Sequence, residues 1–208
     1  MQKLSYIIFD VGGVLLDWRL SSEVVAKKLG VTHDALFDVL FDQSTDQNIG
    51  KRMTVGQLSS HDGWNEVIKK LNGTLTPQEV IDTWYSREFW FPGTLQLVTD
   101  LHNAGYPMAI MSNSWLGLTE HDKASVFPVE IGYFERIFDS SIEKLKKPDV
   151  AFFTLVEREL NVKPETLLLI DDTEKNIQVA EHCGWQGFLY DPLDNGVKAA
   201  QELRTKLL

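Results

Sequence analysis

The chain has 208 residues, of which 43% are hydrophobic, and its formal net charge is −10. This length can bury a sizeable core, whereas the acidic balance argues against a nucleic-acid-binding protein, which needs a basic surface. The single cysteine excludes an internal disulfide. No apolar run resembles a leader or reaches the roughly 18 residues of a membrane helix. We therefore expect a cytoplasmic protein without nucleic-acid or membrane partners.

The first element in chain order is a short apolar run, Tyr6-Ile7-Ile8-Phe9, which is followed by Asp10 and then by Gly12 and Gly13. A β-branched and aromatic run bounded by glycine predicts a buried strand. Asp10 would then lie at the carboxyl end of that strand, where open α/β sheets bind ligands. The alternative interpretation is an acid that only caps a turn, beside glycines that permit positive φ.

Residues 17–90 lack strand signals and predict a set of helices, expected at 22–29, 34–41, 54–71 and 77–89. The last begins at Thr76-Pro77-Gln78-Glu79, a capping box with proline at the first helical position. The polar stretch 46–53 is expected to be a loop. Within it, Lys51 and Arg52 are candidates for holding an anionic substrate group, with a solvated charge pair as the alternative.

From residue 92 onward, helices and strands alternate, which predicts a parallel, doubly wound sheet. Strands are expected at 107–112, 137–140, 167–171 and 187–190, and helices at 95–103, 115–124, 150–160, 174–182 and 197–207. The predicted fold class is therefore α/β, with a core of residues 1–16 and 91–208. Residues 17–90 would form a small all-helical cap over the carboxyl end of the sheet, where a lid excludes water and selects substrate.

Three further polar clusters adjoin these elements. Asp171 and Asp172 end a predicted strand, and two adjacent acids near a buried sheet edge repel each other unless a cation compensates. Mg²⁺ is the commonest hard cation that needs only one or two carboxylates together with phosphate and water. Ser112 and Asn113 end another strand, and Lys147 lies just before a predicted helix.

In this order the clusters resemble the motifs of the haloacid dehalogenase (HAD) superfamily of aspartate-nucleophile hydrolases, along essentially the whole chain. The four motifs are matched by Phe9-Asp10-Val11-Gly12-Gly13-Val14, Ser112-Asn113, Lys147-Pro148, and Asp171-Asp172 with Asn176-Ile177. The resemblance implies a Rossmann-like core, a helical cap, and Asp10 as the nucleophile. It also implies that Ser112, Asn113 and Lys147 bind the transferring phosphoryl group. Magnesium would be held by Asp10, Asp172, the backbone carbonyl of Gly12, and Asp171 beside them.

The residues support the same chemistry on physical grounds. Hydrolysis of a phosphate monoester needs a positioned nucleophile and compensating positive charge. Asp10 can attack phosphorus to form an aspartyl-phosphate, while a cation removes the repulsion between the two anions and Lys147 and Ser112 donate to phosphate oxygens. We therefore expect a magnesium-dependent phosphatase, a monomer or homodimer, that acts on a small phosphorylated metabolite.

Gly12 departs from the pattern of most phosphatases in this superfamily, which carry a second aspartate there to protonate the leaving group. Loss of a general acid typically lowers the rate about 100- to 10,000-fold. Two alternatives therefore remain: a metal-independent 2-haloacid dehalogenase-like hydrolase, whose halide leaves without a proton, and a catalytically weak binding or regulatory protein. Among the tryptophans, Trp115 is a candidate for the pocket, whereas Trp18 and Trp90 are interpreted as hinge packing.

Overall fold

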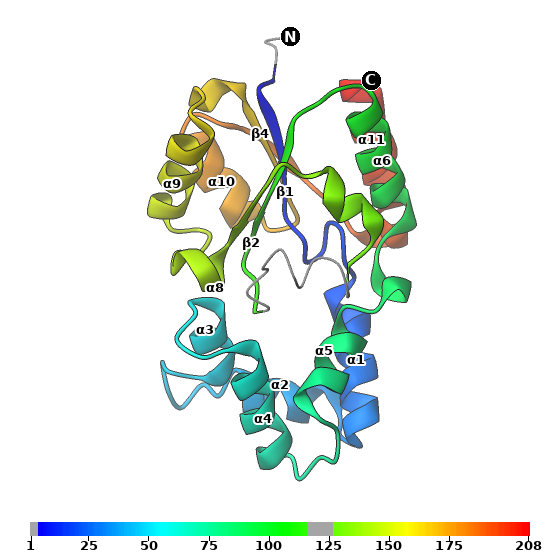
Figure 1. Ribbon diagram of the computed structural model, residues 1–208, viewed down its shortest axis with the longest axis vertical. Coiled ribbons are helices and arrows are strands. Elements are labelled where there is room, and N and C mark those ends of the chain that lie inside the picture. Colours follow the sequence, from blue (N-terminus) through cyan, green and yellow to red (C-terminus); the bar gives the residue numbers. More distant parts are fainter. Residues whose placement is uncertain (1–3, 116–126) are drawn as a thin grey trace.

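The computed structural model describes residues 4–115 and 127–208. Its centre is a five-stranded parallel sheet in the order β3-β2-β1-β4-β5 (Figure 1). The expected strands are confirmed with small shifts at their ends, and their bounds are β1 Tyr6–Phe9, β2 Met108–Ser112, β3 Arg136–Asp139, β4 Leu167–Asp171 and β5 Gln186–Leu189.

Helices cover both faces of the sheet. Successive side chains of a strand point to opposite faces, so each buried strand contributes to two hydrophobic clusters, one under each layer of helices. Ile7 and Phe9 pack in the cluster that includes α6 (Pro92–Asn103) and α11 (Val197–Leu207). Ile8 lies in the other cluster, with α9 (Val150–Leu160) and α10 (Glu174–His182), and Figure 1 shows these two helix pairs on opposite sides. The predicted doubly wound α/β core is confirmed. In the part of the chain that the structure describes, the remaining short elements outside residues 17–90 are η2 Val129–Tyr133, α8 Ser140–Glu143, η3 Pro164–Thr166 and η4 Leu193–Gly196.

Residues 17–90, called the helical insert below, lie beyond the carboxyl ends of the strands, in the lower part of Figure 1. Their elements are α1 Trp18–Leu29, α2 His33–Leu40, α3 Ile49–Thr54, α4 Ser60–Lys70, α5 Pro77–Trp84 and η1 Arg87–Phe89. The expected capping box is confirmed, since Thr76 Oγ1 accepts from Glu79 N at 3.2 Å and Glu79 Oε2 accepts from Thr76 N at 2.7 Å. The helical insert lies over the carboxyl-terminal edge of the sheet, where Asp10 follows β1.

Three expectations about the helical insert are wrong. The stretch 46–53 is not simply a loop, because Asn48 caps α3 by accepting from Lys51 N at 2.9 Å. The helix expected at 54–71 begins only at Ser60, where Ser59 caps α4, and Gly56 adopts a φ of +64° in the segment before it. The helix expected at 77–89 ends as an α-helix at Trp84. Elsewhere, the helix expected at 115–124 falls on residues outside the described part of the chain after Trp115.

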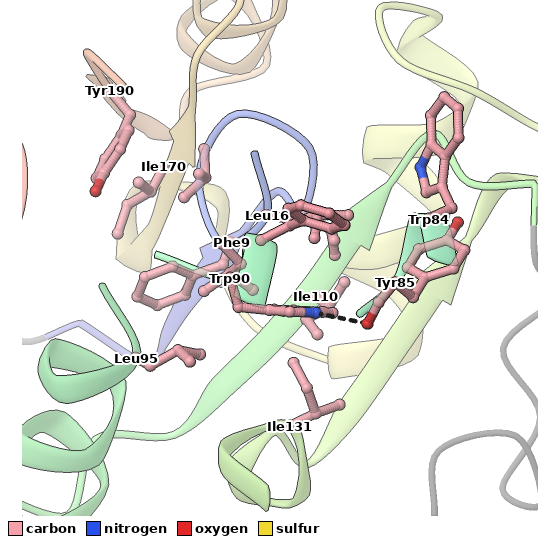
Figure 2. Packing of buried hydrophobic residues seen from close by; sticks show 14 of the residues in the cluster. Phe9, Leu16, Trp84, Tyr85, Trp90, Leu95, Ile110, Ile131, Ile170 and Tyr190 are labelled. Atoms are coloured by element: carbon pink, nitrogen blue, oxygen red, sulfur yellow. Dashed lines mark hydrogen bonds between the residues drawn. The ribbon is translucent and has the colours of Figure 1, made fainter. Parts of the chain in front are cut away.

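Two segments connect the helical insert to the core, and they run side by side. Phe91 N donates to Leu15 O at 2.9 Å, and Asp17 N donates to Phe89 O at 2.8 Å. Trp90 is buried among strand residues, and its Nε1 donates to Tyr85 O at 3.1 Å (Figure 2). The chain thus crosses between the core and the helical insert in these two segments, and the division into two domains stays a prediction. Within residues 4–115 and 127–208, no helix has the length and apolar character needed to cross a membrane.

Candidate active site

Three carboxylates meet where β1 and β4 end. Asp10 follows β1, Asp171 ends β4, and Asp172 follows it; each offers an oxygen within 4.8 Å of the others. The two strands are parallel neighbours in the sheet, so their carboxyl ends lie at the same edge. The structure therefore brings together the acids of the first and last sequence motifs.

Lys147 lies between two of these carboxylates and has no exposed side-chain surface. Its Nζ is 2.5 Å from Asp171 Oδ2 and 3.1 Å from Asp10 Oδ1. Burial by itself lowers the pKa of an ammonium, but the adjacent Asp10 and Asp171 outweigh it and raise the pKa of Lys147. The site thus contains a permanent positive charge beside the candidate nucleophile.

Asp10 is 8% exposed. Burial raises its pKa to about 7; Lys147 opposes this rise, whereas Asp171 and Asp172 add to it. Its Oδ1 accepts from Val11 N at 2.7 Å as well as from Lys147. No residue in the described part of the chain donates a hydrogen bond to Oδ2, so one carboxylate oxygen is oriented and the other is available to a ligand.

Asp171 and Asp172 have different surroundings. Asp171 is fully buried, and its Oδ1 accepts from Thr173 N and Asn176 Nδ2, both at 2.9 Å, while Oδ2 accepts from Lys147. Asp172 is partly exposed and lines a cavity, and burial, then Asp171, raises its pKa. Asp172 is therefore the acid that can bind a ligand from the cavity, whereas Asp171 holds Lys147.

Gly13 makes room for Asp172. Its φ is +78°, and a Cβ at this position would overlap the Asp172 carboxylate. The second glycine of the first motif is thus required both by its backbone conformation and by the close approach of an acid from the last motif.

Asn113 connects the end of β2 to Lys147. Its Nδ2 donates to Lys147 O at 2.9 Å and its Oδ1 accepts from Lys147 N at 2.8 Å. Both ends of the Asn113 amide are therefore engaged with the Lys147 backbone, while Asn113 also lines the cavity, where its second Nδ2 hydrogen can still donate to a ligand. Ser112, the preceding residue, is buried and lines the cavity.

A cavity of about 780 Å³ lies between the carboxylates and the helical insert. Lys51 of α3 and Trp115, both candidates from the sequence, line it. Trp115 Nε1 donates to Thr54 Oγ1 at 2.9 Å, which ties the end of β2 to α3. Arg52 does not line the cavity, because its guanidinium donates to Glu66 Oε2 at 3.2 Å inside the insert. Of the two basic candidates, only Lys51 faces the site.

Trp18 is a lining residue that the sequence analysis assigned to hinge packing. A Cβ built at Gly12 would lie 3.3 Å from Trp18 Cδ1, so the indole lies where a side chain at position 12 would begin. Gly12 itself is outside the left-handed region and needs no glycine for its φ. The signal for Trp18 is an aromatic residue soon after the first motif, whereas Trp90 is buried packing as expected.

Comparison with known proteins agrees with this geometry. A protein-family model for haloacid dehalogenase-like hydrolases matches residues 4–184. Among curated proteins, the sesquiterpene phosphatase of Aspergillus oryzae is 24% identical over 95% of this chain and 93% of its own length. Phosphoglycolate phosphatase of Vibrio parahaemolyticus is 25% identical over 90% of this chain and 83% of its own length. The chain spans only 10% of acyl-CoA dehydrogenase family member 10 of Mus musculus, to which it is 26% identical over 113 residues.

Solved structures share the fold. A predicted HAD-like hydrolase from Porphyromonas gingivalis has a TM-score of 0.70 at 22% identity and covers 97% of this chain and 98% of its own. A HAD family enzyme from Bacteroides thetaiotaomicron, in complex with magnesium and inorganic phosphate, has a TM-score of 0.66 at 22% identity, covering 89% and 93%. L-2-haloacid dehalogenase from Xanthobacter autotrophicus has a TM-score of 0.65 at 16% identity, covering 99% and 84%. The protein belongs to the haloacid dehalogenase-like hydrolases.

Proposed function

We propose that this hydrolase is a magnesium-dependent phosphatase that releases phosphate from a small phosphorylated metabolite through an aspartyl-phosphate at Asp10. The observation that carries the proposal is the group of three carboxylates around the buried ammonium of Lys147, at one end of a cavity. A phosphatase of this kind needs a carboxylate nucleophile, a cation and fixed positive charge, and this group supplies or fits each of them.

The charge balance of the site fits a divalent cation. Three carboxylates face one ammonium, and burial with mutual repulsion raises the pKa values of Asp10 and Asp172. A Mg²⁺ ion would be held by Asp10, Asp172 and the backbone carbonyl of Gly12, with Asp171 beside them. Bound there, it would neutralise the repulsion between the nucleophile and the phosphate.

The residues of the chain then have separate roles. The Asp10 carboxylate attacks phosphorus, and the bond from phosphorus to the leaving oxygen breaks as the aspartyl-phosphate forms. Lys147 and the Ser112 hydroxyl donate to phosphate oxygens, while Asp171 and Asn113 hold Lys147 in place. Water then attacks the aspartyl-phosphate, which releases phosphate and restores the carboxylate.

Two named phosphatases among the relatives and the magnesium–phosphate complex of a structural neighbour support this assignment. The dehalogenase alternative fits the charges less well. A 2-haloacid carries its own carboxylate, which three acids around one lysine would repel unless a cation were present. A cytoplasmic location and a monomeric or homodimeric state stay predictions.

The test is release of phosphate from p-nitrophenyl phosphate by the purified protein, with Mg²⁺ or with excess chelator. We expect turnover with Mg²⁺ only, and less than about one per cent of it in Asp10→Asn, because an amide cannot act as the nucleophile. Asp191→Asn is the matched control, since Asp191 is an exposed acid two residues after β5 that lies outside the carboxylate group. Phosphate release that persists in chelator would contradict the magnesium dependence, and absence of turnover would favour the dehalogenase alternative or the binding protein.

A further inference from the structure

A continuous row of aromatic rings forms one wall of the cavity. It runs from Trp18 through Phe37, Phe41 and Trp115 to Trp84, and all five line the cavity. Neighbouring ring centroids are separated by 6.1, 5.5, 5.8 and 5.3 Å along this row. These separations are in the range of favourable ring–ring contact, so the rings support one another and form a pre-organised surface, called the aromatic wall below.

Packing by residues 4–115 and 127–208 leaves the aromatic wall partly uncovered. Trp18, Phe37, Phe41 and Trp115 are only partly buried, whereas Trp84 is buried. Partly buried rings at a cavity surface leave apolar area in contact with water, and covering that area with an apolar ligand group is favourable. The cavity volume of about 780 Å³ leaves space for such a group in addition to a phosphate.

The polar groups that the helical insert brings to the cavity do not suit a polyol. Thr54 Oγ1 donates to Gly50 O and accepts from Trp115 Nε1, and the Tyr85 hydroxyl is hydrogen-bonded to Ser114. The other two polar residues of the insert in the lining are the cations Arg19 and Lys51. A sugar or polyol needs directed donors and acceptors for its hydroxyl groups, and leaving them unmatched costs binding energy.

The aromatic wall begins at the reacting centre. Trp18 Cδ1 lies 3.3 Å from where a Cβ of Gly12 would be, two residues after the nucleophile. A phosphate seated on Asp10 and Lys147 would therefore direct its organic group past Trp18 and along the rings. The small residue at position 12 and the indole beside it together place apolar surface at the leaving-group end of the site, where the Arg19 guanidinium lies 5.4 Å from the indole centroid.

We infer that the substrate is a phosphate monoester whose organic group is large, apolar and ring-bearing, and that the aromatic wall selects it. The phosphate end of this inference rests on the proposed phosphatase function. The part of the inference about the organic group rests on the ring positions of Trp18, Phe37, Phe41, Trp84 and Trp115. These positions do not depend on whether the protein hydrolyses phosphate esters.

The test is binding of phosphonates, which cannot be hydrolysed, to the wild-type protein with Mg²⁺ by titration calorimetry. The three probes are 2-naphthylmethylphosphonate, methylphosphonate and a linear polyol phosphonate of about the same size as the naphthyl compound. We expect the naphthyl compound to bind at least about tenfold more tightly than the other two, as ring contacts of this kind provide. Equal or tighter binding of the polyol phosphonate would overturn the inference.

Phe37→Leu locates the effect on the aromatic wall, because it removes a half-buried ring that lies between Trp18 and Phe41 in the row. The ratio of naphthyl to methyl affinity should fall at least about threefold in this variant. Tyr133→Leu is the control: Tyr133 is a half-buried aromatic residue outside the cavity lining, and its replacement should leave the ratio unchanged. An unchanged ratio in Phe37→Leu, or an equal fall in Tyr133→Leu, would contradict the assignment.

Turnover separates this inference from the proposed function. Benzyl phosphate and methyl phosphate release alcohols of similar acidity, so a higher kcat/KM for the benzyl ester reports ring binding rather than leaving-group chemistry. If phosphonates show the ring preference but neither ester is hydrolysed, the proposed function fails and the aromatic site stands. If both esters are hydrolysed equally and the phosphonates show no preference, the phosphatase stands and this inference fails.

Discussion

Replacement of Lys147 by methionine tests the charge arrangement at the site most severely. Methionine keeps most of the length of the side chain but removes an ammonium that contacts Asp171 at 2.5 Å and Asp10 at 3.1 Å. The Lys147 side chain and Asp171 are both fully buried, so two acids would lose their compensating charge away from water. Removal of one partner from a buried ion pair typically destabilises a protein by about 3–5 kcal/mol.

We therefore expect Lys147→Met to lower the free energy of unfolding by about 3–5 kcal/mol at pH 8 in chelator, measured by urea denaturation. The loss should shrink at pH 6, because protonation of the acids relieves their repulsion, and Mg²⁺ should restore part of it. Lys146→Met is the matched control, since Lys146 is partly exposed and has no ion pair among the described residues, and its effect should stay within about 0.5 kcal/mol. A loss below about 1 kcal/mol in Lys147→Met would refute the reasoning.

Three further predictions concern the metal and the leaving group. The pKa of Asp10, about 7 against an ordinary 3.8, favours the protonated acid in the folded state, so its contribution to stability is fully present below pH 3.8 and is lost as the pH rises through about 7. Mg²⁺ binds the ionised carboxylate of Asp10, so it should raise Tm more at pH 8 than at pH 6. An equal rise in Tm at the two pH values, or the same pH dependence of the rise in Asp10→Asn, would contradict this prediction. Asp172→Asn should reduce the Tm rise with Mg²⁺ while changing the metal-free Tm little, whereas Asp171→Asn should lower the metal-free Tm; the reverse pattern would exchange their roles. Because Gly12 has no acidic side chain, kcat should rise steeply with the acidity of the leaving group across a series of aryl phosphates. Gly12→Asp should make kcat depend less on that acidity, provided that Trp18 shifts by a few tenths of an ångström to make room for the new side chain. A flat dependence in the wild type, with chemistry rate-limiting, would show that another residue donates the proton.

The strands and the acids at their ends follow directly from the sequence. The apolar runs before Asp10 and before Asp171 each predict a buried strand with an acid at its end, and the order of the motifs decided between a site and a turn cap at Asp10. Because parallel strands end at one edge, the order of the motifs along the chain implies that these acids meet. That part of the candidate site depends on local patterns alone.

Contacts between distant segments could not be predicted in the same way. The reciprocal bonds between Asn113 and Lys147 join residues 34 positions apart, and no periodicity encodes them. The direction of the Trp18 side chain at the start of α1 depends on how the helical insert packs over the sheet. The sequence alone does not show this packing, so Trp18 was interpreted as hinge packing. The start of α3 was missed because Asn48 acts as a cap inside a polar stretch that otherwise suggests a loop.

The central claim is that Asp10 becomes covalently phosphorylated during turnover. The most direct measurement is to mix the protein with Mg²⁺ and an aryl phosphate labelled on phosphorus, to quench in acid, and to locate the label by peptide mapping. The account predicts that the label is attached to Asp10, that hydroxylamine removes it as expected for an acyl phosphate, and that chelator or Asp10→Asn abolishes it. Label on another residue, or turnover that continues in Asp10→Asn, would contradict the account.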